Sequence, residues 1–382
     1  MRLRATWLLL GLPALMIAGC GDGNGDADTD QVDEATSDAD DGAEASDDPV
    51  ELRFTTATAE GSEISNAVEA WGEMVEEATD GRVSVDYFHG GSLIPATEEP
   101  GALEDGRVDA AYVPALYAPD RWPLFNHPPT FVVDNPVDGL FAWHDTLDEN
   151  EHLAEELRDG SLYAVGFIPI SELAVGTEQP LESYTDLEGL RIRSTGESMD
   201  AAMAAAGADP SYVAPAEVYE SVSRGVFDAW TGLPMSLAVA QGMHELTPAI
   251  NGVGLGPGST AALFLSAQTW ESFDADLQQT LDEVTRDWYL EVGDILATAE
   301  QEACDQLAAE DASVTLLPDA EIEAWSAQAL PDITDIWESQ AGELYEQDVI
   351  DDFLATLEAN LDAAAGESGY VNGIEACAEE MG

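Results

Sequence analysis

Two arginines, Arg191 and Arg193, stand one residue apart in the stretch "GLRIRSTGES". Cations are scarce in this chain of 382 residues, which contains no lysine and only 11 arginines against 78 aspartates and glutamates. A guanidinium group can donate two parallel hydrogen bonds to a carboxylate and stays charged when water is excluded. The alternative is an ion pair with a surface acid. Alternate residues of a strand share one face, so the spacing does not say which arginine would bind.

The motifs of common enzyme classes are missing from the sequence. It contains no P-loop, no GxSxG elbow, no HExxH and no GxGxxG that follows a strand. The glycine-rich stretch Gly252–Ser259 lacks the lysine of a P-loop and does not open an amphipathic helix, so we expect a loop there. Carboxylates are too numerous to single out a catalytic pair. We therefore expect a protein that is not an enzyme and has no catalytic residues.

The first nineteen residues have the pattern of a targeting segment. Arg2 and Arg4 form a charged start, and the apolar run Leu8–Ile17 is too short to span a bilayer. The segment ends in "IAGC", which resembles the lipobox of bacterial lipoproteins. We predict that Cys20 is lipidated and anchors the protein to the outer face of the cell membrane, with ordinary secretion as the alternative. Residues 20–49 form an acidic tether that cannot bury enough apolar surface to fold.

Two further cysteines, Cys304 and Cys377, form an even pair in an oxidising compartment. A disulfide between them is one expectation and two free thiols are the other. No CxxC motif or Cys/His cluster has the spacing of metal ligands, and we expect neither a metal nor a cofactor. The histidines are scattered, at positions 89, 127, 144, 152 and 244.

The formal net charge of −67 is extreme. It argues against nucleic acid and anionic membrane surfaces as partners, because both are polyanions. Abundant acids without lysine favour a halophilic protein, in which concentrated salt screens the self-repulsion. A merely acidic protein is the alternative.

Strand and helix patterns alternate from Val50 onward. The apolar residues Ile64, Val68, Trp71 and Val75 have a helical spacing and predict a helix over 62–81. Further helices are expected at 96–107, 198–208, 215–225 and 275–310, and more helices after the last strand, up to about residue 361. Strands are expected at 50–58, 82–88, 108–115, 162–170, 173–179, 190–195, 226–234, 261–266 and 312–318. This order predicts an α/β fold with largely parallel strands.

Four blocks of the sequence resemble one family. They are "GRVSVDYFHGGSL", "GALEDGRVDAAYV", "DLEGLRIRSTGESMDAAMAAAGADPSYVAPAEVYESVSRGVFDAWTGLP" and "FLSAQTWESFDADLQQTLDEV". In this order they resemble the DctP-type solute-binding proteins of tripartite ATP-independent periplasmic (TRAP) transporters, over roughly residues 50–340.

The resemblance implies a two-lobed, periplasmic-binding-protein-like α/β fold with hinge strands and a long helix that spans both lobes. By position, lobe I is 50–170 plus 259–298, lobe II is 171–258 plus 299–340, and 341–382 is a C-terminal helical extension. It also implies a small organic acid bound between the lobes and delivered to the membrane subunits of a TRAP transporter. The alternatives are a receptor that presents its ligand to a membrane sensor protein, and a cell-surface hydrolase.

Arg193 stands where the family places the arginine that holds the ligand's carboxylate. Two other positions depart from the family pattern. Leu173 replaces an arginine of many members, and Gly232 replaces an asparagine. The departures favour a monocarboxylate with an apolar or aromatic remainder.

Further ligand contacts are expected from aromatic and polar side chains. Ring faces can stack on a flat ligand or pack its carbon skeleton, and hydroxyl or carboxylate groups can bond its polar atoms. The aromatic candidates are Trp230, Tyr112, Tyr212 and Trp122, and the polar candidates are Glu60, Thr195 and Thr231. For each of them, core packing or a place on the surface is the alternative.

Overall fold

The computed structural model describes residues 49–118, 120–214, 217–310 and 312–382. The predicted signal segment, Cys20 and nearly all of the tether at 20–49 lie outside these ranges. The strands are β1 (Val50–Thr55), β2 (Val83–Phe88), β3 (Ala110–Pro114), β4 (Leu162–Pro169), β5 (Glu172–Thr177), β6 (Arg191–Ser194), β7 (Asp209–Tyr212), β8 (Ala229–Pro234), β9 (Ala249–Pro257), β10 (Thr260–Ser266) and β11 (Ser313–Leu316).

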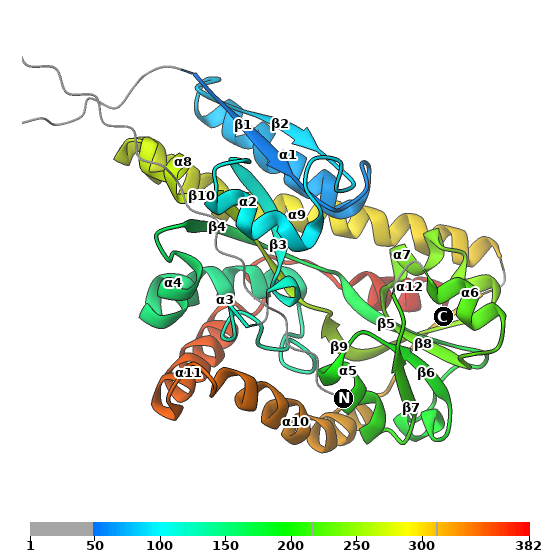
Figure 1. Cartoon of the computed structure of the whole chain (residues 1–382). Coiled ribbons are helices and arrows are strands. Elements are labelled where there is room, and N and C mark those ends of the chain that lie inside the picture. Colours follow the sequence, from blue (N-terminus) through cyan, green and yellow to red (C-terminus); the bar gives the residue numbers. More distant parts are fainter. Residues whose placement is uncertain (1–48, 119, 215–216, 311) are drawn as a thin grey trace, which may run out of the picture. The chain divides into compact units, whose positions relative to one another are not determined.

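The helices cover both sheets and form most of the C-terminal third (Figure 1). They are α1 (Glu63–Ala78), α2 (Glu99–Glu104), α3 (Pro136–Glu149), α4 (Glu151–Leu157), α5 (Glu197–Ala205), α6 (Val218–Ser223), α7 (Met235–Ala240), α8 (Ala267–Ser272), α9 (Ala275–Ala309), α10 (Asp319–Ala341), α11 (Gln347–Ala364) and α12 (Gly373–Met381). Among the described helices, none is both long enough and apolar enough to cross a membrane.

The strands form two mixed sheets, which confirms the predicted α/β class. The first sheet has the order β2-β1-β3-β10-β4, and the second has the order β11-β9-β5-β8-β6-β7. β1 runs parallel to β2 and β3, and β6 runs parallel to β7 and β8. β10 and β5 are antiparallel to both of their neighbours, so the sheets are less parallel than the sequence predicted.

The chain passes between the sheets through very short links. β4 of the first sheet leads to β5 of the second across residues 170–171, and β9 leads back to β10 across 258–259. The chain runs through these two links in opposite directions, and the strands on either side of them pair antiparallel, β4 with β10 and β5 with β9. These two links are the natural places for a hinge.

Helix α1 shows how the predicted spacing becomes packing. Ile64, Val68, Trp71 and Val75 are all buried on one face, and the Ser62 hydroxyl caps the start of the helix. The indole nitrogen of Trp71 donates to the hydroxyl of Thr285 on α9 (3.0 Å). The apolar face and this buried bond fix α1 against α9.

The long helix α9 packs against elements of both sheets. It contacts α1, α3 and β4 on the first side and α7, α12 and β11 on the second. Its 35 residues span about 50 Å at the usual rise per residue. This is the helix along both halves that the family resemblance implied.

The prediction of a loop at Gly252–Ser259 is wrong, because most of this stretch belongs to β9. Its glycines serve close packing: a Cβ at Gly256 would lie 2.4 Å from the carbonyl oxygen of Val133. Gly254 and Gly256 also have positive φ angles, which glycine adopts without strain.

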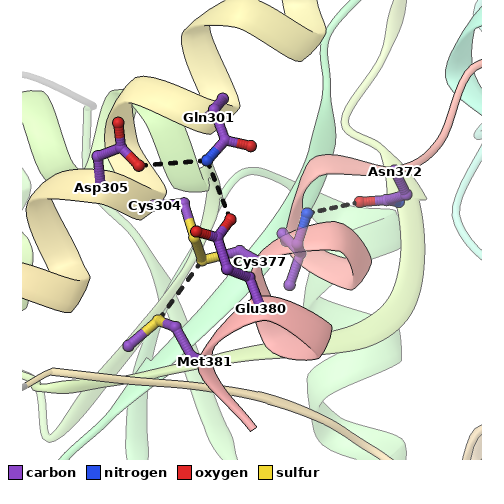
Figure 2. The surroundings of a disulfide bond; sticks show 8 residues. Gln301, Cys304, Asp305, Asn372, Cys377, Glu380 and Met381 are labelled. Carbon is purple, nitrogen blue, oxygen red and sulfur yellow. Dashed lines mark hydrogen bonds between the residues drawn. A yellow bond between two sulfur atoms is a disulfide. The ribbon is translucent and has the colours of Figure 1, made fainter.

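The C-terminal tail, weakly patterned in sequence, ends in α12. A disulfide joins Cys377 of α12 to Cys304 of α9, and Gln301 of α9 donates to Glu380 beside it (3.1 Å) (Figure 2). The last helix is thereby held against α9.

Candidate functional site

Arg193 lies in β6, between β7 and β8, and its side chain is completely buried. Its Nε donates to the carbonyl of Val213 (2.9 Å) and its Nη1 donates to the carbonyl of Thr231 (2.7 Å). Its Nη2 is buried and has no hydrogen-bond partner among the described residues. Two neutral carbonyls do not neutralise a buried cation, so the site lacks an anion.

Burial lowers the pKa of Arg193 to about 10, and the nearby Tyr212 hydroxyl opposes this shift. A pKa of about 10 still leaves the guanidinium charged at neutral pH. The site therefore presents a fixed positive charge whose hydrogen-bonding capacity is only partly used.

The other arginines of the described ranges are differently placed. Of the nine arginines there, eight lie within 4.0 Å of a carboxylate oxygen, and Arg193 is the exception. Arg191, the partner of Arg193 in the sequence motif, is half exposed and forms a fork with Asp228, with bonds of 2.9 and 2.6 Å. In a chain so rich in acids, the lack of a carboxylate at Arg193 sets this site apart.

Three residues surround Arg193 at the carboxyl ends of β6, β7 and β8. Tyr212 is paired with Ser194 across β6 and β7, and its side chain is largely exposed. Thr195 is exposed and approaches Gly232, where a Cβ would lie 2.1 Å from Thr195 Cγ2 and 2.7 Å from Arg193 Nη1. The carboxyl ends of parallel strands are where open α/β sheets usually bind ligands.

One contact joins the segments that follow strands of the two sheets. Ser236 lies in the first turn of α7, which follows β8, and its hydroxyl donates to Glu63 at the start of α1 (2.9 Å). Glu60 lies in the turn between β1 and α1 and is exposed. Glu60 forms no hydrogen bond or ion pair with Arg193 in the described structure, and a ligand role for Glu60 stays a prediction.

Two of the predicted aromatic contacts are packed in the protein interior, and their ligand roles stay predictions. Trp230 is completely buried, its ring covers Gly176, and its indole nitrogen donates to Thr247 (2.7 Å). Trp122 is also completely buried and stacks on Phe264 with 4.9 Å between ring centroids. Both rings belong to the hydrophobic cores, because large apolar groups are most stable there.

The remaining predicted contacts divide into two groups. The hydroxyl of Thr231 donates to the carbonyl of Ala174 (3.0 Å), its own carbonyl accepts from Arg193, and a ligand role for this hydroxyl stays a prediction. Tyr112 lies in β3 and is 4% exposed, whereas Tyr212 and Thr195 are exposed beside Arg193. Ligand roles for Tyr112, Tyr212 and Thr195 stay predictions.

Sequence reasoning missed the groups that hold Arg193 and the residues that join the two sheets. The carbonyl of Val213 is a backbone group, so no pattern of side chains in the sequence predicts its hydrogen bond with Arg193. Glu63 and Ser236 were not singled out, since in a chain with 78 acids no single carboxylate stands out. Leu173, where many family members have arginine, is buried in β5.

The family model for bacterial extracellular solute-binding proteins, family 7 (DctP), matches residues 54–340. The chain belongs to this family. It is 26% identical over 247 residues to the C4-dicarboxylate-binding periplasmic protein DctP of Rhodobacter capsulatus, covering 61% of this chain and 70% of that protein.

Solved structures show the same fold. A TRAP solute-binding protein from Rhodoferax ferrireducens, in complex with copurified benzoate, matches with a TM-score of 0.69 and 18% identity over 84% of this chain and 99% of that one. The periplasmic ectoine-binding protein of the TeaABC TRAP transporter of Halomonas elongata matches with a TM-score of 0.66 and 20% identity, over 82% and 100%. The chain is thus a solute-binding protein and not an enzyme, and it has the two-lobed α/β fold of TRAP solute-binding proteins. As a member of this family of extracellular solute-binding proteins, it binds a small-molecule solute.

Proposed function

We propose that this receptor captures a small monocarboxylate with an apolar or aromatic remainder, holds its carboxylate on Arg193 and delivers it to a TRAP transporter for uptake. The observation that carries this proposal is the buried Nη2 of Arg193, which has no partner among the described residues. A buried donor left without an acceptor is costly, and a ligand carboxylate would satisfy it.

The geometry of Arg193 supports a particular mode of binding. A guanidinium group has five N–H donors, of which Nε–H and one hydrogen of Nη1 go to the carbonyls of Val213 and Thr231. The two hydrogens of Nη2 and the second hydrogen of Nη1 remain. A carboxylate approaching the Nη1–Nη2 end can therefore accept two parallel bonds.

The surroundings of Arg193 favour one carboxylate over two. Arg191 is occupied by Asp228, Leu173 is apolar, and Gly232 has no side chain. A second carboxylate would need a second cation, whereas a ring or carbon chain can pack against Tyr212. The benzoate found in the Rhodoferax ferrireducens protein is a ligand of this kind, although that protein shares only the fold with this chain.

A thermal-shift screen tests this proposal. We expect benzoate-like and short aliphatic monocarboxylates to raise the melting temperature, because a ligand that binds only the folded form stabilises it by linkage. Succinate serves as the dicarboxylate comparison. Arg193→Ala should abolish the shift, while Arg191→Ala, which removes a surface cation from the same strand, should keep it. Equal shifts in both variants would overturn the role of Arg193.

We also propose that Cys20 carries the lipid anchor and that 50–170 plus 259–298 and 171–258 plus 299–340 are the two lobes. The "IAGC" box supports the anchor, and the residues of the two sheets support the lobes. Metabolic labelling with a radioactive fatty acid tests the anchor: label should enter the native chain and not the Cys20→Ser variant, and equal labelling of both would rule it out.

A further inference from the structure

Ser236 is hydrogen-bonded to two carboxyl groups where the two halves of the protein meet, one of them partly exposed (Glu63) and one buried (Glu300). The hydroxyl of Ser236 on α7 donates to Glu63 Oε2 on α1 (2.9 Å), and its backbone N–H donates to Glu300 Oε1 on α9 (3.3 Å). Helix α1 covers the first sheet, while α7 directly follows β8 of the second. Any movement of the two sheets relative to each other at this point must change the bonds to Ser236.

The C-terminal segment 366–373 closes over these carboxyl groups. Asn372 donates through its side chain to Glu172 Oε2, at the start of β5, and the backbone N–H of Gly254 donates to Glu172 Oε1 (3.1 Å). Gly373 packs against Glu300 so closely that a Cβ there would lie 2.2 Å from the Glu300 Cβ. Glu300 is 1% exposed, and its Oε2 has no partner in the part of the chain that the structure describes.

Both ends of this segment are fixed. Asp138 on α3 accepts from the backbone N–H groups of Gly366 (2.7 Å) and Ser368 (2.9 Å). On the other side, the disulfide holds α12 against α9 (Figure 2). Glu172 and Glu300 are thereby buried, while Glu63 stays partly exposed.

The electrostatic surroundings of the cluster are entirely acidic. Burial is the main cause that raises the pKa of Glu63, of Glu172 to about 7 and of Glu300 to about 8, and Glu63 and Glu172 raise that of Glu300 further. The other titratable groups that act on the cluster, within the described ranges, are Tyr370 in the closing segment, Glu375 on α12 and Asp134 before α3. No group of acids in these ranges is arranged to hold a metal ion.

We propose that Glu63, Glu172 and Glu300 form a proton-binding site that keeps α1, α7 and the C-terminal segment together, so that ionisation of the cluster releases the junction. Two ionised carboxylates sharing Ser236 would repel each other in a poorly solvated place, whereas protonated carboxyls do not. The arrangement of the two sheets is then coupled to pH, whatever ligand the receptor binds.

The direction of the pH dependence follows from the raised pKa values. Folded-state pKa values above that of a free glutamate, about 4.3, mean that the stabilisation is complete below that pH. It is lost as the pH rises through about 7 to 8, where Glu172 and Glu300 ionise. Each linked proton changes the opening equilibrium by about tenfold per pH unit.

Hydrogen–deuterium exchange of the ligand-free, full-length protein tests this coupling. Exchange in peptides from α7 and from 366–373 is measured from pH 5 to 9 in one concentration of NaCl and corrected for the intrinsic rate. We expect the opening constant of these peptides to rise about tenfold or more per pH unit from pH 5 to about 7 and to level off above about pH 8, where Glu172 and Glu300 are ionised in both states. Peptides from β4 and β10, in the core of the first sheet, should show no such rise.

Matched variants decide whether the cluster is responsible. Glu300→Gln should flatten the pH profile, because the amide is neutral at every pH, while Glu302→Gln, exposed on the same helix, should keep the profile of the native protein. If Glu300→Gln does not fold, as judged by circular dichroism, Glu63→Gln provides the same test. A flat profile in the native protein, or an unchanged one in the Gln variants, would overturn the proposal. Loss of protection from hydrogen exchange when sodium is replaced with choline at constant pH would also overturn the proposal, since that result indicates a metal ion in the cluster.

Discussion

At the scale of single residues, one charge in an unusual setting defines the candidate site. Arg191 and Arg193 are equivalent in the sequence pattern, yet the first pairs with Asp228 on the surface, and the second is buried with no carboxylate partner among the residues that the structure describes. The space that Arg193 needs is preserved by Gly232, whose φ of +82° and lack of a Cβ allow Nη1 and Thr195 to come close. Gly232 therefore shapes the site without touching a ligand.

This role of Gly232 predicts that a side chain at this position abolishes ligand binding, while the protein still folds with a moderately lower free energy of unfolding. Gly232→Ala adds a Cβ that would lie 2.1 Å from Thr195 Cγ2 and 2.7 Å from Arg193 Nη1, so Arg193 must move. We expect the free energy of unfolding to fall by about 1–2 kcal/mol from backbone strain and the ligand-induced thermal shift to disappear. Gly225→Ala is the matched control, because Gly225 has a φ of +71° and open space around it. It should lose similar stability and keep the thermal shift; loss of the shift in both variants would contradict this role.

At the scale of elements, the disulfide decides how firmly the end of the chain is held. It links α9 and α12 across 73 residues of sequence. Closing a loop of this length restricts the unfolded chain, so we expect reduction, or Cys304→Ser with Cys377→Ser, to lower the free energy of unfolding by about 2–4 kcal/mol. Urea denaturation with and without a reductant measures this. The double Ser variant should not respond to the reductant, and a native protein that is equally stable in both conditions would show that the bond is not formed.

Elements with a regular apolar spacing were predictable, and elements shaped by backbone contacts were not. The spacing of Val68, Trp71 and Val75 predicted α1, and the long amphipathic pattern predicted α9. Residues 252–257 were misread as a loop because their glycines, which fit β9 against the backbone at Val133, look the same in sequence as those of a flexible loop.

The same limit applies to the candidate site. Arg193 could be singled out from the sequence, because the resemblance to the family motif distinguishes its position from that of Arg191. Trp230 could not be placed, since an aromatic residue near a strand end suits a ligand contact and a core equally well, and Gly176 leaves room for its ring in the core.

At the scale of the whole molecule, the charge of −67 sets the conditions in which all of these contacts operate. The arginine ion pairs are individually weak at the surface, and 11 cations cannot neutralise 78 acids, so net repulsion opposes the folded state in dilute buffer. The screening length falls from about 10 Å at 0.1 M salt to about 3 Å at 1 M, which removes most of that repulsion.

This argument predicts a halophilic stability profile at neutral pH. The melting temperature, followed by circular dichroism, should rise steadily from 0.1 M to 2 M NaCl, because screening weakens repulsion between many acids more than it weakens a few ion pairs. Near pH 4.5 part of the carboxylates are protonated, the repulsion is smaller, and the same increase in salt should raise the melting temperature less. A protein most stable in dilute buffer at pH 7 would contradict the halophilic interpretation. An equal salt effect at both pH values would show that salt acts on apolar burial and not on the acidic surface.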